Sequence, residues 1–169
     1  GRVWKLLGEC ISLNSAAREV ADIGLLSTGA GPRTHGGNTV DRALLLALRK
    51  LGIDPLDVRS KAKVVRRWPY AKESGRGSVL ILMNNGMGRL YTVGSFSAVG
   101  GRCARRLNEM GEEEGLEGAV RDQIFDTVSS MVDDKNLHTL AMAYRDIPNP
   151  AALEAFSSPG ENPPPPPPP

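Results

Sequence analysis

Residues 78–93 read SVLILMNNGMGRLYTV, and this stretch decides the fold. Its two ends, Ser78–Met83 and Arg89–Val93, are rich in the β-branched, aromatic and other apolar residues of strands. The Asn-Asn-Gly between them, residues 84–86, tolerates the positive φ of a tight turn, so the stretch predicts a β-hairpin. A third β-rich run, Val64–Tyr70, precedes the hairpin. Consecutive strands joined by short turns indicate an antiparallel sheet.

Helical periodicity precedes these strands. Residues 3–14 place apolar side chains at the i, i+3, i+4, i+7 and i+8 positions of one helical face. Residues 27–37 are rich in glycine and predict a flexible loop. The next helix begins at Asn38 or Thr39, either of which can cap it, and ends at Gly52. Its predicted buried stripe is Val40, Ala43, Leu44, Ala47, Leu48 and Leu51.

Further elements follow on both sides of the hairpin. Asp54-Pro55 starts a short helix that extends to about Lys61. Gly94-Ser95 starts another that extends to about Leu107, and residues 111–118 form an acidic connection. Apolar residues from Leu116 to Met131 mark a long amphipathic helix, and alternation over residues 138–146 predicts a strand. The predicted fold class is α+β, an antiparallel twisted sheet flanked by helices.

The composition is that of an ordinary globular domain. Of 169 residues, 40% are hydrophobic and 24% charged, with a formal net charge of +2. This near balance gives no reason to expect nucleic acid or an anionic membrane surface as a partner. Cys10 and Cys103 lie outside any CxxC pattern and predict reduced thiols. No stretch reaches the roughly 20 apolar residues of a membrane span.

The two ends of the chain differ from its middle. It opens with Gly-Arg-Val-Trp, without an initiator Met or a signal sequence, and we expect a piece of a longer polypeptide. Residues 157–169 end in seven prolines and cannot form a core. We therefore predict one domain over residues 1–156 and a disordered or polyproline II linker over 157–169. A polyproline run can also bind an SH3 domain or profilin, and such a partner is the alternative to a stiff linker.

Residue types alone indicate no active site. The chain has only two histidines, and it contains no defensible Ser/His/Asp or Cys/His set and no GxxxxGK[ST] phosphate loop. The acidic run Glu112–Glu114 is expected on a solvated turn and does not indicate a metal site. We predict no catalytic residue and no metal ligand in this chain.

Four segments have counterparts, in the same order, in one protein family. Gly37–Leu45 (GNTVDRALL) resembles its GNxTExALL segment, and Tyr70–Val79 (YAKESGRGSV) resembles its FxSxRKxMS stretch. Tyr91–Ser95 (YTVGS) falls where the family has (F/Y)xKGA, with Cys103 at the matching downstream cysteine. Leu137–Asp146 (LHTLAMAYRD) resembles LRxLxxAxRD. The family is that of the P-type calcium pumps, especially the plasma-membrane type.

The resemblance covers residues 3 to 148 and implies the nucleotide-binding domain of such a pump. In these pumps the domain presents the γ-phosphate of ATP to an aspartate of a separate DKTGT motif, which this chain lacks. The implied cofactor is ATP, with Mg²⁺ held through the phosphorylation domain. The implied partners are the phosphorylation and transmembrane domains of the same polypeptide, in a cytoplasmic domain of an integral membrane protein. Calcium as the transported ion is inferred from the resemblance alone.

The resemblance also assigns nucleotide contacts. Tyr70 falls at the adenine-stacking aromatic, with an edge-strand aromatic as the alternative. Asp41 matches the acidic contact to the adenine amino group, with a charge of the first helical turn as the alternative. Lys72 lies near the family's phosphate-contacting arginine, and Arg76 is close by on the same loop. Solvated loop charges are the alternative for both.

Several family positions carry other residues in this chain. Val93 replaces the KGA lysine, and Gly75 replaces the second lysine of the RK pair. Ser97 stands where the family has glutamate, and His138 where it has a phosphate-contacting arginine. Gly94 is kept and can let the backbone approach a ligand closely. Because a contact from a cation to phosphate contributes about 1.5–3 kcal/mol, these replacements predict weak nucleotide binding.

Two interpretations follow. In the first, the chain is an ATP-binding domain that uses Asp41, Tyr70, Lys72, Arg76, Val93, Gly94 and His138. In the second, it is a degenerate domain with a structural or protein-interaction role and little nucleotide binding. A free-standing adaptor unrelated to pumps would make the four matches accidental. We favour the first, because tethering raises effective concentration and the phosphorylation domain with Mg²⁺ supplies further contacts.

Overall fold

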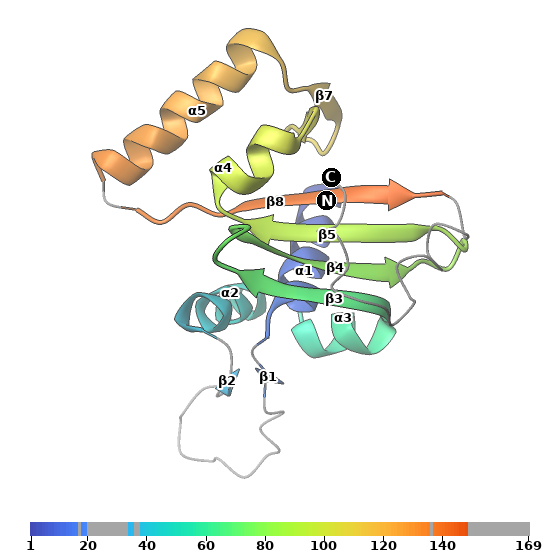
Figure 1. The fold of residues 1–169 in the computed structure, drawn as a ribbon. Helices are drawn as coiled ribbons and strands as arrows, with labels where there is room; N and C mark the ends of the chain where they lie inside the picture. The colour runs from blue at the N-terminus through green and yellow to red at the C-terminus, as the bar shows by residue number, and fades with distance from the viewer. Residues whose placement is uncertain (17, 20–33, 36–37, 136, 149–169) are drawn as a thin grey trace.

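A four-stranded antiparallel sheet forms the centre of the molecule (Figure 1). The computed structural model describes residues 1–16, 18–19, 34–35, 38–135 and 137–148. The sheet has the order β3 (Lys63–Ala71), β4 (Arg76–Leu82), β5 (Gly88–Gly94) and β8 (Ala141–Ile147). Two small pairs accompany it: β1 (Arg18–Glu19) with β2 (Thr34–His35), and β6 (Arg105–Leu107) with β7 (Glu113–Gly115).

Helices flank this sheet and confirm the predicted α+β architecture. They are α1 (Arg2–Asn14), α2 (Thr39–Lys50), α3 (Pro55–Lys61), α4 (Phe96–Val99), the 3-10 helix η1 (Gly100–Arg102) and α5 (Gly118–Asp133). None of the helices in the described part of the chain combines the length and apolarity that crossing a bilayer requires.

The β4–β5 hairpin forms as predicted. Met83 N donates to Met87 O at 2.8 Å across its tip. Gly86 has a φ of 81°, which glycine adopts without strain. Asn85 Oδ1 accepts a hydrogen bond from Met87 N at 3.1 Å. The Asn-Asn-Gly sequence therefore closes the turn through both its backbone conformation and a side-chain hydrogen bond.

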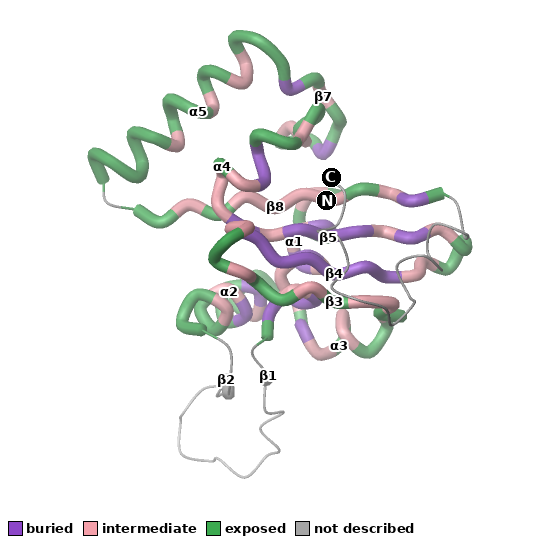
Figure 2. The backbone as a smooth tube through the Cα atoms, viewed as in Figure 1, coloured by how far each residue is buried: buried purple, intermediate pink, exposed green. Residues whose placement is uncertain are grey.

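Each face of the sheet has its own apolar cluster. On the face covered by α1, the cluster comprises Leu6, Cys10, Leu13, Val79, Ile81 and Tyr91. On the opposite face it comprises Leu80, Leu90 and Ile147. Successive side chains of a strand point to opposite faces, so β4 gives its odd-numbered residues to the α1 face and its even-numbered residues to the opposite face. Figure 2 shows the central strands β4 and β5 as the most continuously buried part of the sheet.

Side-chain caps explain where α2 and α3 begin. Asn38 Oδ1 accepts from Asp41 N at 2.8 Å and caps α2. Asp54 Oδ1 accepts from Leu56 N at 3.0 Å at the start of α3, where Pro55 occupies the first turn. Both helix starts agree with the sequence prediction.

The buried side of α2 differs from the predicted stripe. Leu48 of the predicted stripe is buried, and so is Leu45 outside it, whereas Val40 and Leu51 of the stripe are exposed. The prediction had the wrong rotation because residues 44–46 are three consecutive leucines, which fit more than one helical face. Leu45 is buried, whereas Ala43 and Ala47 of the predicted stripe are exposed. Burying a leucine removes more apolar area from water than burying an alanine.

The region after β5 departs furthest from the prediction. The single helix expected from residue 94 to 107 is wrong: α4 has four residues, and η1 and β6 follow it. Gly100 and Gly101 lie at this break, where their low helix propensity disfavours continuation. The predicted connection 111–118 contains β7, which ion pairs join to β6.

The predicted long helix is present as α5, although none of its residues is fully buried. Phe125 meets the ring of Phe96 edge to face, with centroids 4.8 Å apart. Arg121 donates to the carbonyl oxygens of Cys103 at 2.7 Å and Leu116 at 3.1 Å. Figure 1 shows α5 standing away from the sheet, and Figure 2 shows mostly exposed residues along it.

The last strand begins later than predicted. β8 starts at Ala141 and not at His138, because its partner β5 ends at Gly94, which pairs with Ala141. The predicted loop 27–37 lies outside the described residues except for Thr34–His35, which form β2 instead. The predicted domain end at 156 and the linker 157–169 also lie outside the described residues.

Candidate functional site

One edge of the sheet collects most of the candidate residues. β3 ends there at Ala71, β4 begins at Arg76, β5 ends at Gly94 and β8 begins at Ala141. Because neighbouring strands are antiparallel, these four ends meet at the same edge, on the left in Figure 1. We call it the strand-end edge. At it, or in the turn beyond it, lie Tyr70, Lys72, Arg76, Val93 and Gly94.

Tyr70, Gly77 and Val93 form a row across three strands at this edge. Gly77 pairs with Val93, and a Cβ on Gly77 would lie 3.0 Å from Tyr70 N. Gly77 and Val93 belong to the α1 face, where Val93 packs against the apolar cluster. The Tyr70 side chain is 58% exposed and is therefore no core aromatic. We call these three residues the Tyr70 row.

Gly77 was not among the residues singled out from sequence. A signal was present, since a glycine inside a β-rich run often marks a bulge or a close approach of another group. The structure has an irregularity there, with the β3–β4 register shifting between Trp68 and Ala71. The backbone of Trp68 and Tyr70 occupies the space that a side chain at Gly77 would need, and this close approach explains the glycine.

Gly94 is needed for the backbone of the sheet itself. A Cβ at this position would collide with the Gly75 carbonyl oxygen and lie 2.8 Å from Arg76 Cβ. The adjacent Ser95 N donates to the Gly75 oxygen at 3.0 Å, which holds the β3–β4 turn against the end of β5. Close approach of strand and turn therefore explains the glycine without a ligand.

Lys72 lies in the turn between β3 and β4 and is exposed. Gly75 closes this turn with a φ of 66° and donates its N–H to Ala71 O at 2.9 Å. Glycine suits the left-handed conformation, which accounts for its presence where the related motif has a lysine.

Asp41 and His138 occupy different settings. Asp41 lies in the first turn of α2, and its Oδ2 accepts from Ala16 N at 3.2 Å, just beyond the end of α1. Its carboxylate thus has a structural contact between two helices. His138 is exposed and precedes β8 by three residues.

Arg76 points away from the Tyr70 row. It is the first residue of β4, whereas the sequence had suggested a position in a loop. Alternation along β4 places it on the opposite face with Ser78, whose Oγ lies 2.9 Å from Thr92 Oγ1 in a buried pair. Arg76 therefore lies on the face opposite Gly77 and Val93, although all three are near the same edge.

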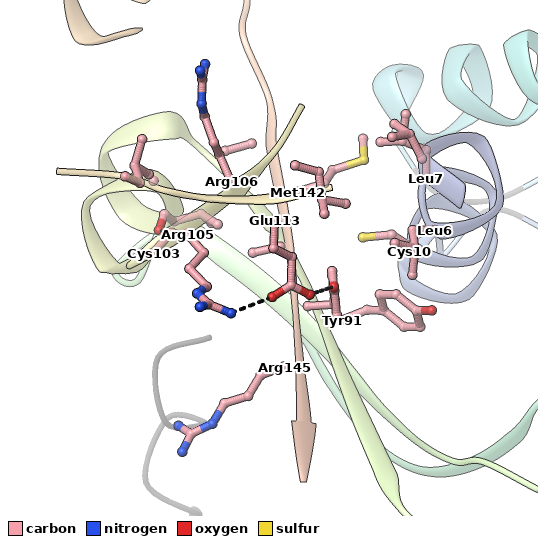
Figure 3. A pocket seen from close by; sticks show the side chains of 18 of the residues that line it. Leu6, Leu7, Cys10, Tyr91, Cys103, Arg105, Arg106, Glu113, Met142 and Arg145 are labelled. Carbon is pink, nitrogen blue, oxygen red and sulfur yellow. Dashed lines mark hydrogen bonds and ion pairs between the residues drawn. The ribbon is translucent and has the colours of Figure 1, made fainter. Parts of the chain in front are cut away.

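The main cavity lies elsewhere. It has a volume of about 710 Å³ between α1, β8 and the segment from α4 to α5. Figure 3 shows Leu6, Leu7 and Cys10 on one side of it and Cys103 and Arg105 on the other. None of the seven candidate residues lines it.

Glu113 organises polar groups at the rim of this cavity. Its carboxylate accepts from Arg2 at 3.0 Å and from the Tyr144 hydroxyl at 2.7 Å. It also accepts from Arg105 at 2.9 Å, a contact marked in Figure 3. These donors, with Tyr144 first, hold the pKa of Glu113 below its usual value. The network ties α1, β6, β7 and β8 together.

The two cysteines lack the properties of reactive thiols. Burial raises the pKa of Cys10 to about 12, and a hydrogen bond from Asn14 offsets little of this. Burial also raises the pKa of Cys103, against the charge of Arg121. Both are therefore protonated near neutral pH. In the described ranges, no three His, Cys, Asp or Glu side chains gather as a metal site would require.

The comparison with protein families decides the assignment. The family model described as P-type ATPase, cytoplasmic domain N, matches residues 2–163. The chain belongs to this N-domain family. The resemblance found in the four sequence motifs is thereby confirmed, together with the α+β fold that it implied.

Individual relatives of this N domain are calcium pumps by name. The chain is 28% identical over 144 residues to calcium-transporting ATPase PAT1 of Dictyostelium discoideum, covering 85% of this chain and 12% of that protein. It is 31% identical over 123 residues to plasma membrane calcium-transporting ATPase 1 of Homo sapiens, covering 71% and 10%. The match to the Gallus gallus protein is 32% over 123 residues, again 71% and 10%. The chain spans about a tenth of the length of these relatives.

Proposed function

We propose that this N domain binds adenine nucleotide at the Tyr70 row. The observation that supports it is the exposure of Tyr70, which is 58% exposed near the end of the edge strand β3 and so leaves aromatic surface open to a ligand. Stacking of a base on one aromatic contributes about 1–3 kcal/mol and needs no charge. Val93, which pairs with Gly77, offers an apolar side chain in place of the family's lysine.

The remaining contacts are those that the resemblance implies. Asp41 accepts a hydrogen bond from the adenine amino group, and Gly94 lets a ligand approach the backbone closely. Lys72 and His138 are the groups for the phosphates. Because Val93 and Gly75 replace two lysines, this set binds ATP weakly, in the sub-millimolar range at best.

The nucleotide serves a larger protein in this proposal. The relatives are named as calcium-transporting ATPases, and we place this domain in the cytoplasmic part of such a membrane pump. There it positions ATP for phosphorylation of an aspartate in a separate domain, which also supplies Mg²⁺. This chain holds the nucleotide, and we expect no ATP turnover from it alone.

A second candidate function is a degenerate N domain with a structural or protein-interaction role. Two observations favour it: Val93 is a hydrophobic residue at the lysine position, and the Asp41 carboxylate already accepts from Ala16 N. The two candidates differ in whether the chain binds adenosine at all.

The test is an amide-shift titration with adenosine, which carries no phosphate. Tyr70→Ala should weaken adenosine binding about tenfold or more through loss of stacking. Tyr70→Phe keeps the ring and is the matched control, expected to bind within about twofold of the native chain. Equal affinity of the native and Tyr70→Ala chains would refute the platform, and no adenosine binding by the native chain would favour the second candidate.

A further inference from the structure

Among the described residues, β8 is the last strand of the four-stranded sheet and pairs with β5 alone. The hydrogen bonds of the β4–β5 pair fix the direction of the backbone groups in both strands. Met83 N donates to Met87 O at the hairpin tip, and Ser95 N donates to Gly75 O at the other end. Since antiparallel strands alternate residue by residue, the odd-numbered residues of β5 turn their N–H and C=O groups toward β4. The even-numbered residues of β5 therefore bond to β8.

The same alternation continues into β8. Thr92 of β5 pairs with Ala143, so the odd-numbered residues of β8 bond to β5. The main-chain N–H and C=O groups of Met142, Tyr144 and Asp146 therefore point away from the sheet. In the part of the chain that the structure describes, no hydrogen bond reaches these main-chain groups. All three residues are only partly exposed, and such an unpaired strand edge is a template for another strand.

The main cavity runs along this free edge. Every residue from 140 to 146 lines it. Leu6 and Leu7 of α1 lie on one side of it (Figure 3), and Leu116 and Ile124 of the α4–α5 segment also line it. Its volume of about 710 Å³ is within the range of about 300–1,000 Å³ that is typical of ligand sites. The unpaired backbone groups of β8 thus face a preformed space with apolar walls.

The side chains beside the edge indicate what a bound strand carries. Met142 packs against the apolar cluster of the α1 face, which includes Leu6. A strand paired with β8 places every second side chain on that face of the sheet. Apolar side chains at those positions would cover Leu6 and Leu7. The fold therefore favours a strand with apolar residues at alternate positions.

The rim of the cavity has more cationic than anionic groups around Glu113. Its carboxylate is shared by the guanidinium groups of Arg2 and Arg105. The Arg105 side chain is 70% exposed. The neighbouring Arg106 pairs with Glu114 one to one. A carboxylate of a bound peptide beside Arg105 would therefore complement the charge of this rim.

We propose that β8 binds an extended peptide from outside this chain as a fifth strand, with apolar side chains at every second position and a carboxylate beside Arg105. Main-chain hydrogen bonds to Met142, Tyr144 and Asp146 hold the peptide, as in other β-strand additions. A second copy of this chain fits this edge less well, because α4, β7 and α5 lie beyond it in each copy (Figure 1). The inference goes beyond nucleotide binding, because it concerns the side of β8 and not the strand-end edge.

The first test titrates the 169-residue chain with the peptide acetyl-EVTVEVT-amide and follows amide shifts. We expect saturable shifts at Met142, Tyr144 and Asp146. Two further peptides carry N-methyl groups, one on its valines and the other on its remaining residues. One of them loses the N–H groups that face β8 and should bind about tenfold or more weakly, while the other should bind within about twofold of the parent peptide. Equal affinities of the two methylated peptides, or no binding of the parent peptide, overturn the proposal.

Met142→Pro tests the same contact from the side of the protein. Proline lacks the outward N–H and is tolerated on edge strands where that group bonds to no neighbour. Met142→Ala is the matched control, because it removes the side chain and keeps the N–H. The proline variant should bind the parent peptide about fivefold or more weakly than the alanine variant. Equal affinity in the two folded variants contradicts the proposal, and if the proline variant does not fold, the methylated peptides decide.

Three measurements distinguish the occupant of the edge. A dimer of the native chain that Met142→Pro dissociates, seen by sedimentation, would assign the edge to a second copy and overturn the proposal. A peptide with lysine in place of both glutamates should bind about threefold or more weakly, and tighter binding would contradict the charge of the rim. Saturating adenosine should change the peptide affinity by less than about twofold, because the two sites are separate. Displacement of the peptide by adenosine would instead place it at the nucleotide site.

Discussion

The four-stranded sheet and the segment from α4 to α5 are stabilised by different kinds of interaction. Val79, Leu80 and Tyr91 are almost completely buried in the sheet, whereas α5 has no fully buried residue. Arg2 and Tyr144 join the α4–α5 segment to the rest through Glu113, whereas the Arg121–Cys103 hydrogen bond and the Phe96–Phe125 ring contact lie within the segment. Apolar burial resists changes in pH and salt better than surface ion pairs do. The strand-end edge thus belongs to the region whose stability depends little on pH and salt. The rim of the cavity belongs to the region whose stability depends on them more.

The largest expected effect comes from breaking the sheet. Leu80→Ala removes a fully buried leucine and should lower the free energy of unfolding by about 2–5 kcal/mol. Leu46→Ala makes the same substitution at an exposed position of α2 and should cost about 0.5 kcal/mol. Denaturant unfolding measures both. Similar losses in the two variants would show that the sheet is not the main source of stability.

The sequence alone predicted the structure correctly where local signals and packing agree. Asn85 and Gly86 fix the hairpin, and Asn38 and Asp54 fix two helix starts, because each acts through neighbours in the chain. The single helix predicted from Gly94-Ser95 to Leu107 was wrong. The actual β6–β7 pairing depends on partners that become neighbours only after folding.

The candidate site was also only partly predictable from sequence. The positions of Tyr70, Val93 and Gly94 at one edge followed from the hairpin and the strand order. The face of Arg76 did not, because side-chain direction depends on register and the β3–β4 register shifts between Trp68 and Ala71. The role of Gly77 likewise depends on a contact between strands that sequence spacing does not reveal.

A smaller effect should distinguish the sheet from the α4–α5 segment, because their stabilities should respond differently to pH. The pKa of Glu113 is lowered in the folded chain, so its charged form stabilises the fold above the unfolded pKa of about 4.3. This contribution is lost as pH falls from there through the lowered folded pKa. Glu113 is partly exposed, so we expect about 0.5 kcal/mol or less. Hydrogen exchange should show loosening of β7 and α4 at low pH before the sheet opens.

Glu113→Gln is the control for that measurement. It keeps the shape of the side chain but removes its titration, so the local pH dependence should disappear. Glu117→Gln, at an exposed carboxylate before α5, should leave it intact. Loosening of β4 and β5 at the same pH as β7 would contradict the division into two regions.

The measurement that tests the central claim most directly is an ATP titration that maps amide shifts along the native chain and Val93→Lys. The account predicts shifts concentrated at Tyr70, Gly77 and Val93, and about tenfold tighter binding when lysine is restored beside the ring. Phosphate release should stay at background in both chains, because the variant adds a contact and no nucleophile. Shifts confined to the cavity between α1 and α5, or unchanged affinity in Val93→Lys, would contradict nucleotide binding at the Tyr70 row.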